Sequence, residues 1–105
     1  MVTAQRTETC PLAEILHGIL NDMAVSAKEG NLNAYRSANR TFEKWRALYC
    51  DRNYIDAHLA NPFDKSRDKI CTYLTQVIND LPIRPKLLRE ACEIADYSLA
   101  YSNNL

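Results

Sequence analysis

Residues 34–49, AYRSANRTFEKWRALY, hold four of the nine aromatic residues of the chain and its only tryptophan. Apolar side chains recur in this stretch at steps of three and four residues. Their positions are Tyr35, Ala38, Phe42, Trp45 and Tyr49. In a helix of about 3.6 residues per turn, this spacing places them on one narrow face, which needs a partner surface. We therefore expect residues 34–49 to form the central helix of the fold.

The residues before this stretch predict another helix, over about 11–29. Pro11 suits a first helical turn, where a missing N–H costs nothing, and Gly30 suits a left-handed helix end. Asn31 and Asn33 are good caps for the helix that follows. Because so few residues separate the two helices, we expect an antiparallel hairpin whose apolar faces meet.

The second half of the chain predicts two more main helices. Pro62 opens a helix over residues 63–81, and Pro82 ends it because proline has no backbone donor. A last helix begins near Pro85. Residues 51–60 predict a short extra helical segment between the second and third main helices, or a kinked extension of the second helix. The pattern predicts an all-α fold, an up-down bundle of four main helices.

Length and charge set limits on the function. A chain of 105 residues supports one core, so we expect a single domain over 1–105, with 1–9 flexible. Thirteen Lys and Arg balance thirteen Asp and Glu, so no overall charge attracts nucleic acid or an anionic membrane. No apolar run has the length of a membrane span, and the first residues lack the apolar core of a signal peptide. We expect a cytoplasmic protein unless a signal sequence has been removed.

The four cysteines allow two interpretations. They contain no CxxC pair, so the sequence predicts no structural metal site. The predicted hairpins bring Cys10 near Cys50 and Cys71 near Cys92, and each pair can form a disulfide if its Cα atoms lie within about 7 Å. Two disulfides would indicate a periplasmic or secreted protein. The alternative is four thiols in a reducing cytosol.

Basic residues provide the clearest candidate for a binding surface. Arg36, Arg40 and Lys44 follow one another at four-residue steps, roughly opposite the aromatic face. Like charges at this spacing repel by about 0.2–0.5 kcal/mol per pair, so an anionic partner would stabilise them. Acidic residues of the helix over 11–29 are the alternative source of negative charge. The predicted partner-binding residues are Arg36, Arg40, Lys44, Trp45, Arg46 and Tyr49.

Catalytic chemistry has little support. His17 lies on the polar margin of its helix, and His58 has only Asp56 as a nearby carboxylate. A Glu-x-x-His pair occurs once, at Glu14 and His17, whereas a di-iron bundle needs one on each of two helices. No base lies beside a cysteine in the sequence. We predict no enzyme activity, no metal and no cofactor.

No motif in the sequence specifies a ligand. We predict a non-catalytic protein that acts through protein–protein interaction as a regulator, an inhibitor or an adaptor. Its aromatic face also suits self-association as a homodimer. One alternative is a nucleic-acid accessory protein that uses the basic residues. Another is a disulfide-stapled inhibitor or immunity protein of the periplasm or the extracellular space.

Overall fold

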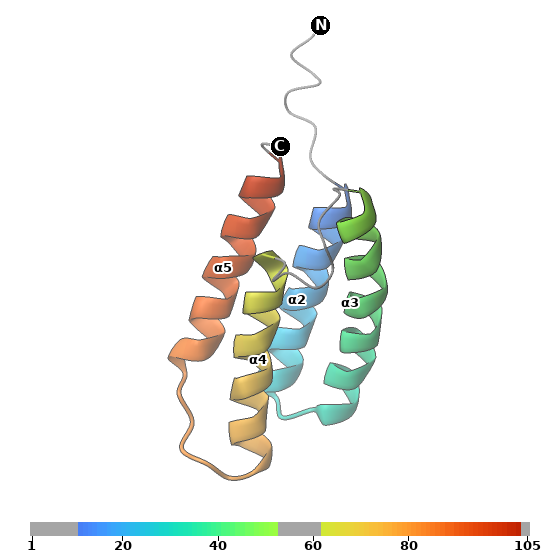
Figure 1. Ribbon diagram of the computed structural model, residues 1–105. Helices are drawn as coiled ribbons and strands as arrows, with labels where there is room; N and C mark the ends of the chain where they lie inside the picture. Colours follow the sequence, from blue (N-terminus) through green and yellow to red (C-terminus); the bar gives the residue numbers. More distant parts are fainter. Residues whose placement is uncertain (1–10, 53–61, 104–105) are drawn as a thin grey trace, which may run out of the picture.

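The computed structural model describes residues 11–52 and 62–103, which form four α-helices. They are α2 (Pro11–Lys28), α3 (Leu32–Arg52), α4 (Pro62–Ile78) and α5 (Lys86–Asn103). Successive helices run in opposite directions along the bundle (Figure 1). The predicted all-α up-down bundle of four main helices is confirmed. The extra segment predicted over 51–60 lies almost entirely outside the described residues, as do residues 1–9.

The turn between α2 and α3 follows the predicted chemistry. Gly30 has a φ of 69°, in the left-handed region, and Asn31 N donates a hydrogen bond to Ser26 O at 2.9 Å. The Asn31 side chain then caps α3 by accepting a hydrogen bond from Ala34 N at 3.0 Å. A Cβ atom at residue 30 would lie 3.3 Å from Val77 of α4. Backbone conformation and space therefore both favour glycine here.

The connection between α4 and α5 starts earlier in the chain than predicted. α4 ends at Ile78 instead of residue 81, because Asp80 adopts a φ of 56° and turns the chain. Leu81 N donates a hydrogen bond to Gln76 O at 2.9 Å, the same pattern that closes α2. All residues from 79 to 86 are exposed. The spacing of apolar residues does not indicate that a residue other than glycine adopts a left-handed conformation. The prediction from the sequence therefore placed the end of α4 three residues too late.

The helix at the centre of the bundle is α2, and the prediction that residues 34–49 form the central helix is wrong. α2 packs closely against each of the other three helices, whereas α3 packs closely only against α2. Ala13, Ala24 and Ala27 are buried on α2, and such small side chains let neighbouring backbones approach. The large aromatic side chains of α3, including Phe42 and Tyr49, instead reach across a wider gap.

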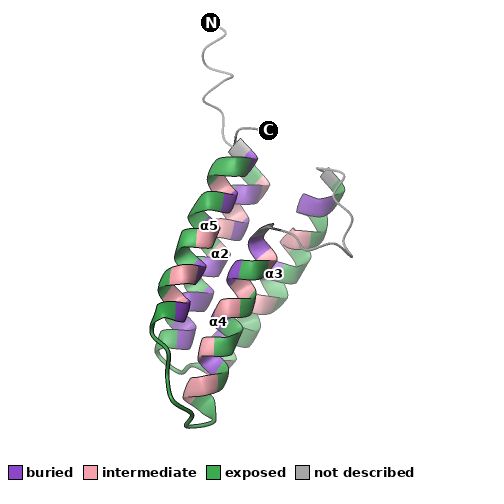
Figure 2. Cartoon of the chain, turned by 60° about the vertical axis from the view of Figure 1, so that its left-hand side comes forward, coloured by how far each residue is buried: buried purple, intermediate pink, exposed green. Residues whose placement is uncertain are grey.

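The inner faces of the helices are buried and their outer faces are exposed (Figure 2). Tyr49 of α3 and Phe63 of α4 meet edge to face, with ring centroids 5.4 Å apart. Tyr49 Oη and Ser102 Oγ share a hydrogen bond of 2.7 Å, and Ser66 Oγ donates to Ala91 O at 2.7 Å. Across the described ranges, no buried side-chain nitrogen or oxygen lacks a hydrogen-bond partner. The polar groups of the core are thus satisfied inside the bundle.

The outer surface of the bundle mixes charged and apolar side chains. The large apolar side chains that are exposed are Val25, Leu48, Ile78, Leu81, Ile83, Tyr97 and Tyr101. A search of the described residues finds no helix with the length and apolar character that crossing a membrane requires.

Candidate functional site

Arg46, one of the predicted partner-binding residues, is part of the bundle. Its Nε donates a hydrogen bond to Asp64 Oδ1 at 2.7 Å, and its Nη2 donates to Asp64 Oδ2 at 2.7 Å. The side chains are only 16% and 14% exposed. The hydrogen bond with Asp64 raises the pKa of Arg46 above its ordinary value. This two-pronged pair joins α3 to α4 and holds the guanidinium against the protein.

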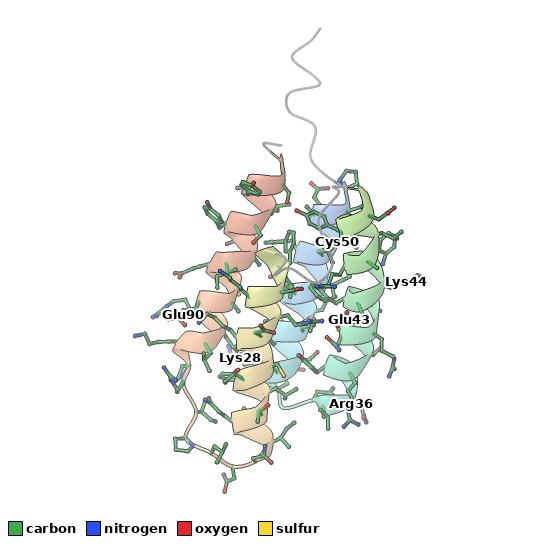
Figure 3. All side chains as sticks on the ribbon, viewed as in Figure 1. Lys28, Arg36, Glu43, Lys44, Cys50 and Glu90 are labelled. Carbon is green, nitrogen blue, oxygen red and sulfur yellow. The ribbon has the colours of Figure 1, made fainter. Side chains whose placement is uncertain are left out.

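A second arginine, from α4, reaches across the space between α3 and α4. Arg67 of α4 pairs with Glu43 of α3, and its guanidinium lies 5.0 Å from the centroid of the Phe42 ring. Glu43 is directed towards α4, whereas Lys44 points away from the bundle (Figure 3). We refer to the contacts of Phe42, Glu43, Arg46, Tyr49, Phe63, Asp64 and Arg67 as the α3–α4 seam.

The two aromatic residues predicted to bind a partner face inwards. Tyr49 is completely buried by Phe63 and Ser102, so it offers no surface to another molecule in this fold. Trp45 is half-buried and packs against the core. The aromatic face of α3 is thus used within the bundle.

The other three predicted binding residues form an exposed basic stripe on the outer face of α3. Arg36, Arg40 and Lys44 are exposed, and none forms an ion pair with another described residue. The expected neutralisation by acidic residues of α2 is not seen in the described part of the chain. Among the described residues, α3 forms its ion pairs with α4, and α2 forms its ion pair through His17 with α5.

An apolar groove lies where α2, α4 and α5 meet, and sequence reasoning did not find it. Its volume is about 370 Å³, and we name it the α2–α5 groove. The lining residues are Ala24, Val25, Lys28, Tyr73, Pro85, Leu88, Arg89 and Cys92. One sequence signal was present, because Val25 is an apolar residue outside the core-facing arc of α2. The structure leaves that side chain 56% exposed.

The cysteines have separate surroundings. Cys71 and Cys92 are both exposed free thiols in this structure, which agrees with the thiol interpretation of this pair and not with the disulfide alternative. Cys92 lies in the groove, where partial burial, followed by the carboxylates of Asp96 and Glu93, raises the pKa of its thiol. Burial and the neighbouring Cys71 raise the pKa of Tyr35. Cys50 is buried, and the predicted Cys10–Cys50 pair cannot be assessed because Cys10 lies outside the described residues.

The histidine that the structure describes makes a surface contact. His17 Nε2 lies 2.6 Å from Asp96 Oδ1, which links α2 to α5, and His58 lies outside the described residues. The described ranges contain no group of three or more His, Cys, Asp or Glu side chains suited to a metal ion. The absence of enzyme activity and of a cofactor stays a prediction.

Within the described residues, the basic stripe and the α2–α5 groove are the two exposed surfaces that we take as candidates. Comparisons of the chain with models of protein families, with curated proteins and with solved structures found no match.

Proposed function

We propose that this protein is a non-catalytic helical protein that binds another protein and acts as a regulator, an inhibitor or an adaptor. The observation that supports this proposal is the α2–α5 groove, an apolar hollow that opens on the surface of the bundle. Apolar surface that is left in water is unfavourable by about 25 cal/mol per Å², and covering it with a partner recovers that free energy.

Exposed apolar residues in the groove lining and in the connection that leads to it add to the surface that a partner can cover. Val25 lines the groove and is 56% exposed. Leu81 and Ile83, each 49% exposed, belong to the connection that ends at Pro85, another lining residue. A binding surface carried on packed helices also needs little ordering when the partner arrives, which favours affinity.

Matched charge variants test this proposal. Val25→Glu places a carboxylate at the groove, and Leu48→Glu makes the same change on α3, where the leucine is 42% exposed. In affinity capture from cells that make the protein, we expect the wild type and Leu48→Glu to retain the same partner, and Val25→Glu to lose it. The proposal is wrong if no protein is retained stoichiometrically by the wild type. Circular dichroism of each variant controls for folding.

The exposed basic stripe supports a second candidate function, a nucleic-acid accessory protein. Three neutralised phosphates would give a slope of about −2.7 for the logarithm of the binding constant against the logarithm of salt concentration. Fluorescence anisotropy with a duplex oligonucleotide measures this slope. Arg40→Glu should abolish such binding, while Lys65→Glu, an exposed basic residue of α4, serves as the matched control. No binding at low salt would exclude this candidate.

A homodimer through the aromatic face of α3 stays a prediction, and the burial of Phe42 and Tyr49 in the monomer reduces the surface available for it. Sedimentation equilibrium of the full chain over a range of concentrations measures the state directly.

A further inference from the structure

We propose that the α2–α5 groove binds an amphipathic helix of a partner protein that carries acidic residues beside its apolar face. This inference rests on the proposed protein-binding function and adds the chemistry of the partner. Val25, Tyr73 and Leu88 would contact the apolar side chains of that helix. Lys28 and Arg89 would pair with its acidic side chains.

The size of the groove suits a few apolar side chains. Its volume of about 370 Å³ is near the low end of the range of about 300–1,000 Å³ for ligand sites. Ala24 contributes only a methyl group to the lining, which leaves space beside the larger Tyr73 and Leu88. Helices that bind in grooves insert such anchors at positions i, i+3, i+4 and i+7. The groove accepts these anchors, while the remainder of the helix lies across its rim.

The surroundings favour a macromolecule over a small apolar ligand. A small molecule that filled the groove would leave the outer part of Val25 in water, since this residue is 56% exposed. A helix is about 10–12 Å wide with its side chains, so it covers both the groove and its apolar margin.

The charge at one end of the groove determines the sign of the partner. Lys28 ends α2 and Arg89 lies in the first turn of α5, and the antiparallel arrangement brings both to the same end of the bundle. Neither forms an ion pair with another described residue. Arg84 and Lys86 flank Pro85 at this end, and the acidic residues near it in the chain are Glu29, Asp80 and Glu90, of which Glu90 pairs with Lys69. The basic excess favours acidic side chains on the partner.

Beyond Cys92, α5 carries two carboxylates, Glu93 and Asp96, outside the groove lining, and Asp96 contacts His17. Glu93 and Asp96 lie close enough to Cys92 to raise the pKa of its thiol. A partner helix therefore places its acidic residues near Lys28 and Arg89, and away from these two carboxylates. The groove thus selects the direction of the helix as well as its charge.

A pair of designed peptides tests this proposal with the full, reduced chain. The acidic peptide is an amphipathic helix of about five turns with leucines at i, i+4 and i+7 and glutamates beside them; the basic peptide keeps the leucines and replaces each glutamate with lysine. Amide shifts of the ¹⁵N-labelled chain locate the binding site. We expect the acidic peptide to shift the amide signals of residues 24–28 and 86–92 and to bind roughly tenfold more tightly than the basic peptide.

Alkylation provides a second readout that uses an internal control. A helix in the groove should cover Cys92 and slow its reaction with iodoacetamide severalfold, while Cys71, an exposed thiol of α4 outside the groove lining, should react at an unchanged rate. Mass spectrometry of tryptic peptides separates the two sites.

Variants assign the contacts to individual residues. Val25→Glu should weaken binding of the acidic peptide by roughly tenfold or more, because it removes an apolar contact and adds a charge of the same sign as the peptide. Arg89→Gln should weaken it by roughly two- to fivefold, the value of an exposed ion pair. Leu48→Glu and Arg40→Gln, which make the same changes on α3, should bind like the wild type.

Several results would overturn the proposal. They are equal affinity for the two peptides, amide shifts confined to α3, or no binding up to about 1 mM. Self-association that Val25→Glu abolishes would also overturn it, because the groove would then hold a second copy of the chain. If affinity capture yields a partner that Val25→Glu loses while the peptides fail, protein binding stands and the acidic-helix assignment is wrong. If both fail, both proposals are wrong.

Discussion

The α3–α4 seam and the α2–α5 groove are two meeting places of helices in one bundle, and they differ in what fills them. In the seam, both arginines have carboxylate partners, and the rings of Tyr49 and Phe63 are in contact. In the groove, Lys28 and Arg89 form no ion pair with described residues, and an apolar side chain is left half in water. Paired charges hold the fold together, whereas unpaired charges beside apolar surface are available to a partner.

The difference has a cause in side-chain size. α3 stands away from α4, and only long or aromatic side chains cross that gap, so the seam needs them for its own packing. α2 lies close to α5, and Ala24 of α2 lines the groove beside Leu88, Arg89 and Cys92 of α5. The small side chain of Ala24, near the end of α2, helps to leave this hollow open. The variants below test this assignment of roles.

Phe42→Ala should have the largest effect on stability. The ring is completely buried and supports the guanidinium of Arg67 at 5.0 Å. Its removal leaves a cavity in the seam, and we expect the free energy of unfolding to fall by about 3–5 kcal/mol. Urea unfolding followed by circular dichroism measures this change. Leu48→Ala, an exposed position on the same helix, is the control and should change stability by less than about 0.5 kcal/mol. Similar losses for both variants would contradict a packed seam.

Asp64→Ala should have the next largest effect. It leaves the largely buried Arg46 without the carboxylate that accepts two of its hydrogen bonds, and we expect a loss of about 2 kcal/mol. Lys44→Ala, which removes an exposed charge of the stripe, should be nearly neutral. The double variant Arg46→Met with Asp64→Leu should recover most of the loss, because no charge is then left without its partner. Failure of that recovery in urea unfolding would mean that the pair does more than satisfy its own charges.

Tyr35→Phe should make stability less sensitive to alkaline pH. Tyr35 of α3 is 8% exposed, and burial raises its pKa above the ordinary value of about 10. The unfolded chain therefore releases this proton at a lower pH than the folded chain does. The stabilisation that this pKa difference provides is complete below the pKa of Tyr35 in the unfolded chain. It is lost as the pH rises above that value, by about 1 kcal/mol or less per pH unit. Unfolding curves between about pH 9 and 11 should be flatter for the variant than for the wild type. Parallel curves would show that Tyr35 ionises as it does in the unfolded chain.

The thiol of Cys92, in the α2–α5 groove, should be alkylated slowly. Since partial burial and two carboxylates raise its pKa, the reactive thiolate is scarcer at pH 8 than for an ordinary thiol. Glu93→Gln removes one of these carboxylates and should speed the reaction without unfolding the chain. Rates of iodoacetamide labelling at residue 92, compared with a small free thiol, measure the effect. A reaction as fast as that of the free thiol would contradict the assigned environment.

Arg89→Gln should have the smallest effect on stability. The side chain is exposed and pairs with no described carboxylate, so we expect a change within about 0.5 kcal/mol in urea unfolding. A loss comparable to that of Asp64→Ala would mean that the groove charges belong to the fold and would remove the distinction between the two regions.

Much of the fold could be predicted because its signals are local. The apolar period gave the helices, Gly30 and Asn31 marked the turn between α2 and α3, and Pro62 and Pro85 marked helix starts within one residue. The misplaced end of α4 has a local cause of a less recognisable kind, the left-handed conformation of Asp80. Aspartate adopts this conformation far less often than glycine, so the residue type alone does not predict it.

The candidate site was much less predictable. The helical period places Arg36 and Arg40 opposite the aromatic face and Arg46 beside it, but it does not show that Arg46 meets a carboxylate of α4. That outcome depends on which side of α3 faces α4 and on the width of the gap. The groove was missed because its lining comes from three segments, 24–28, residue 73 and 85–92, that are far apart in the chain.

The sequence by itself determined that this chain forms amphipathic helices with defined ends, because periodicity, caps and prolines act over a few residues. Only the tertiary structure decided that α2 occupies the centre, which arginines are paired and where the apolar groove opens. Those features depend on how closely whole helices approach one another. Small and large side chains set that distance together, from positions that no local pattern connects.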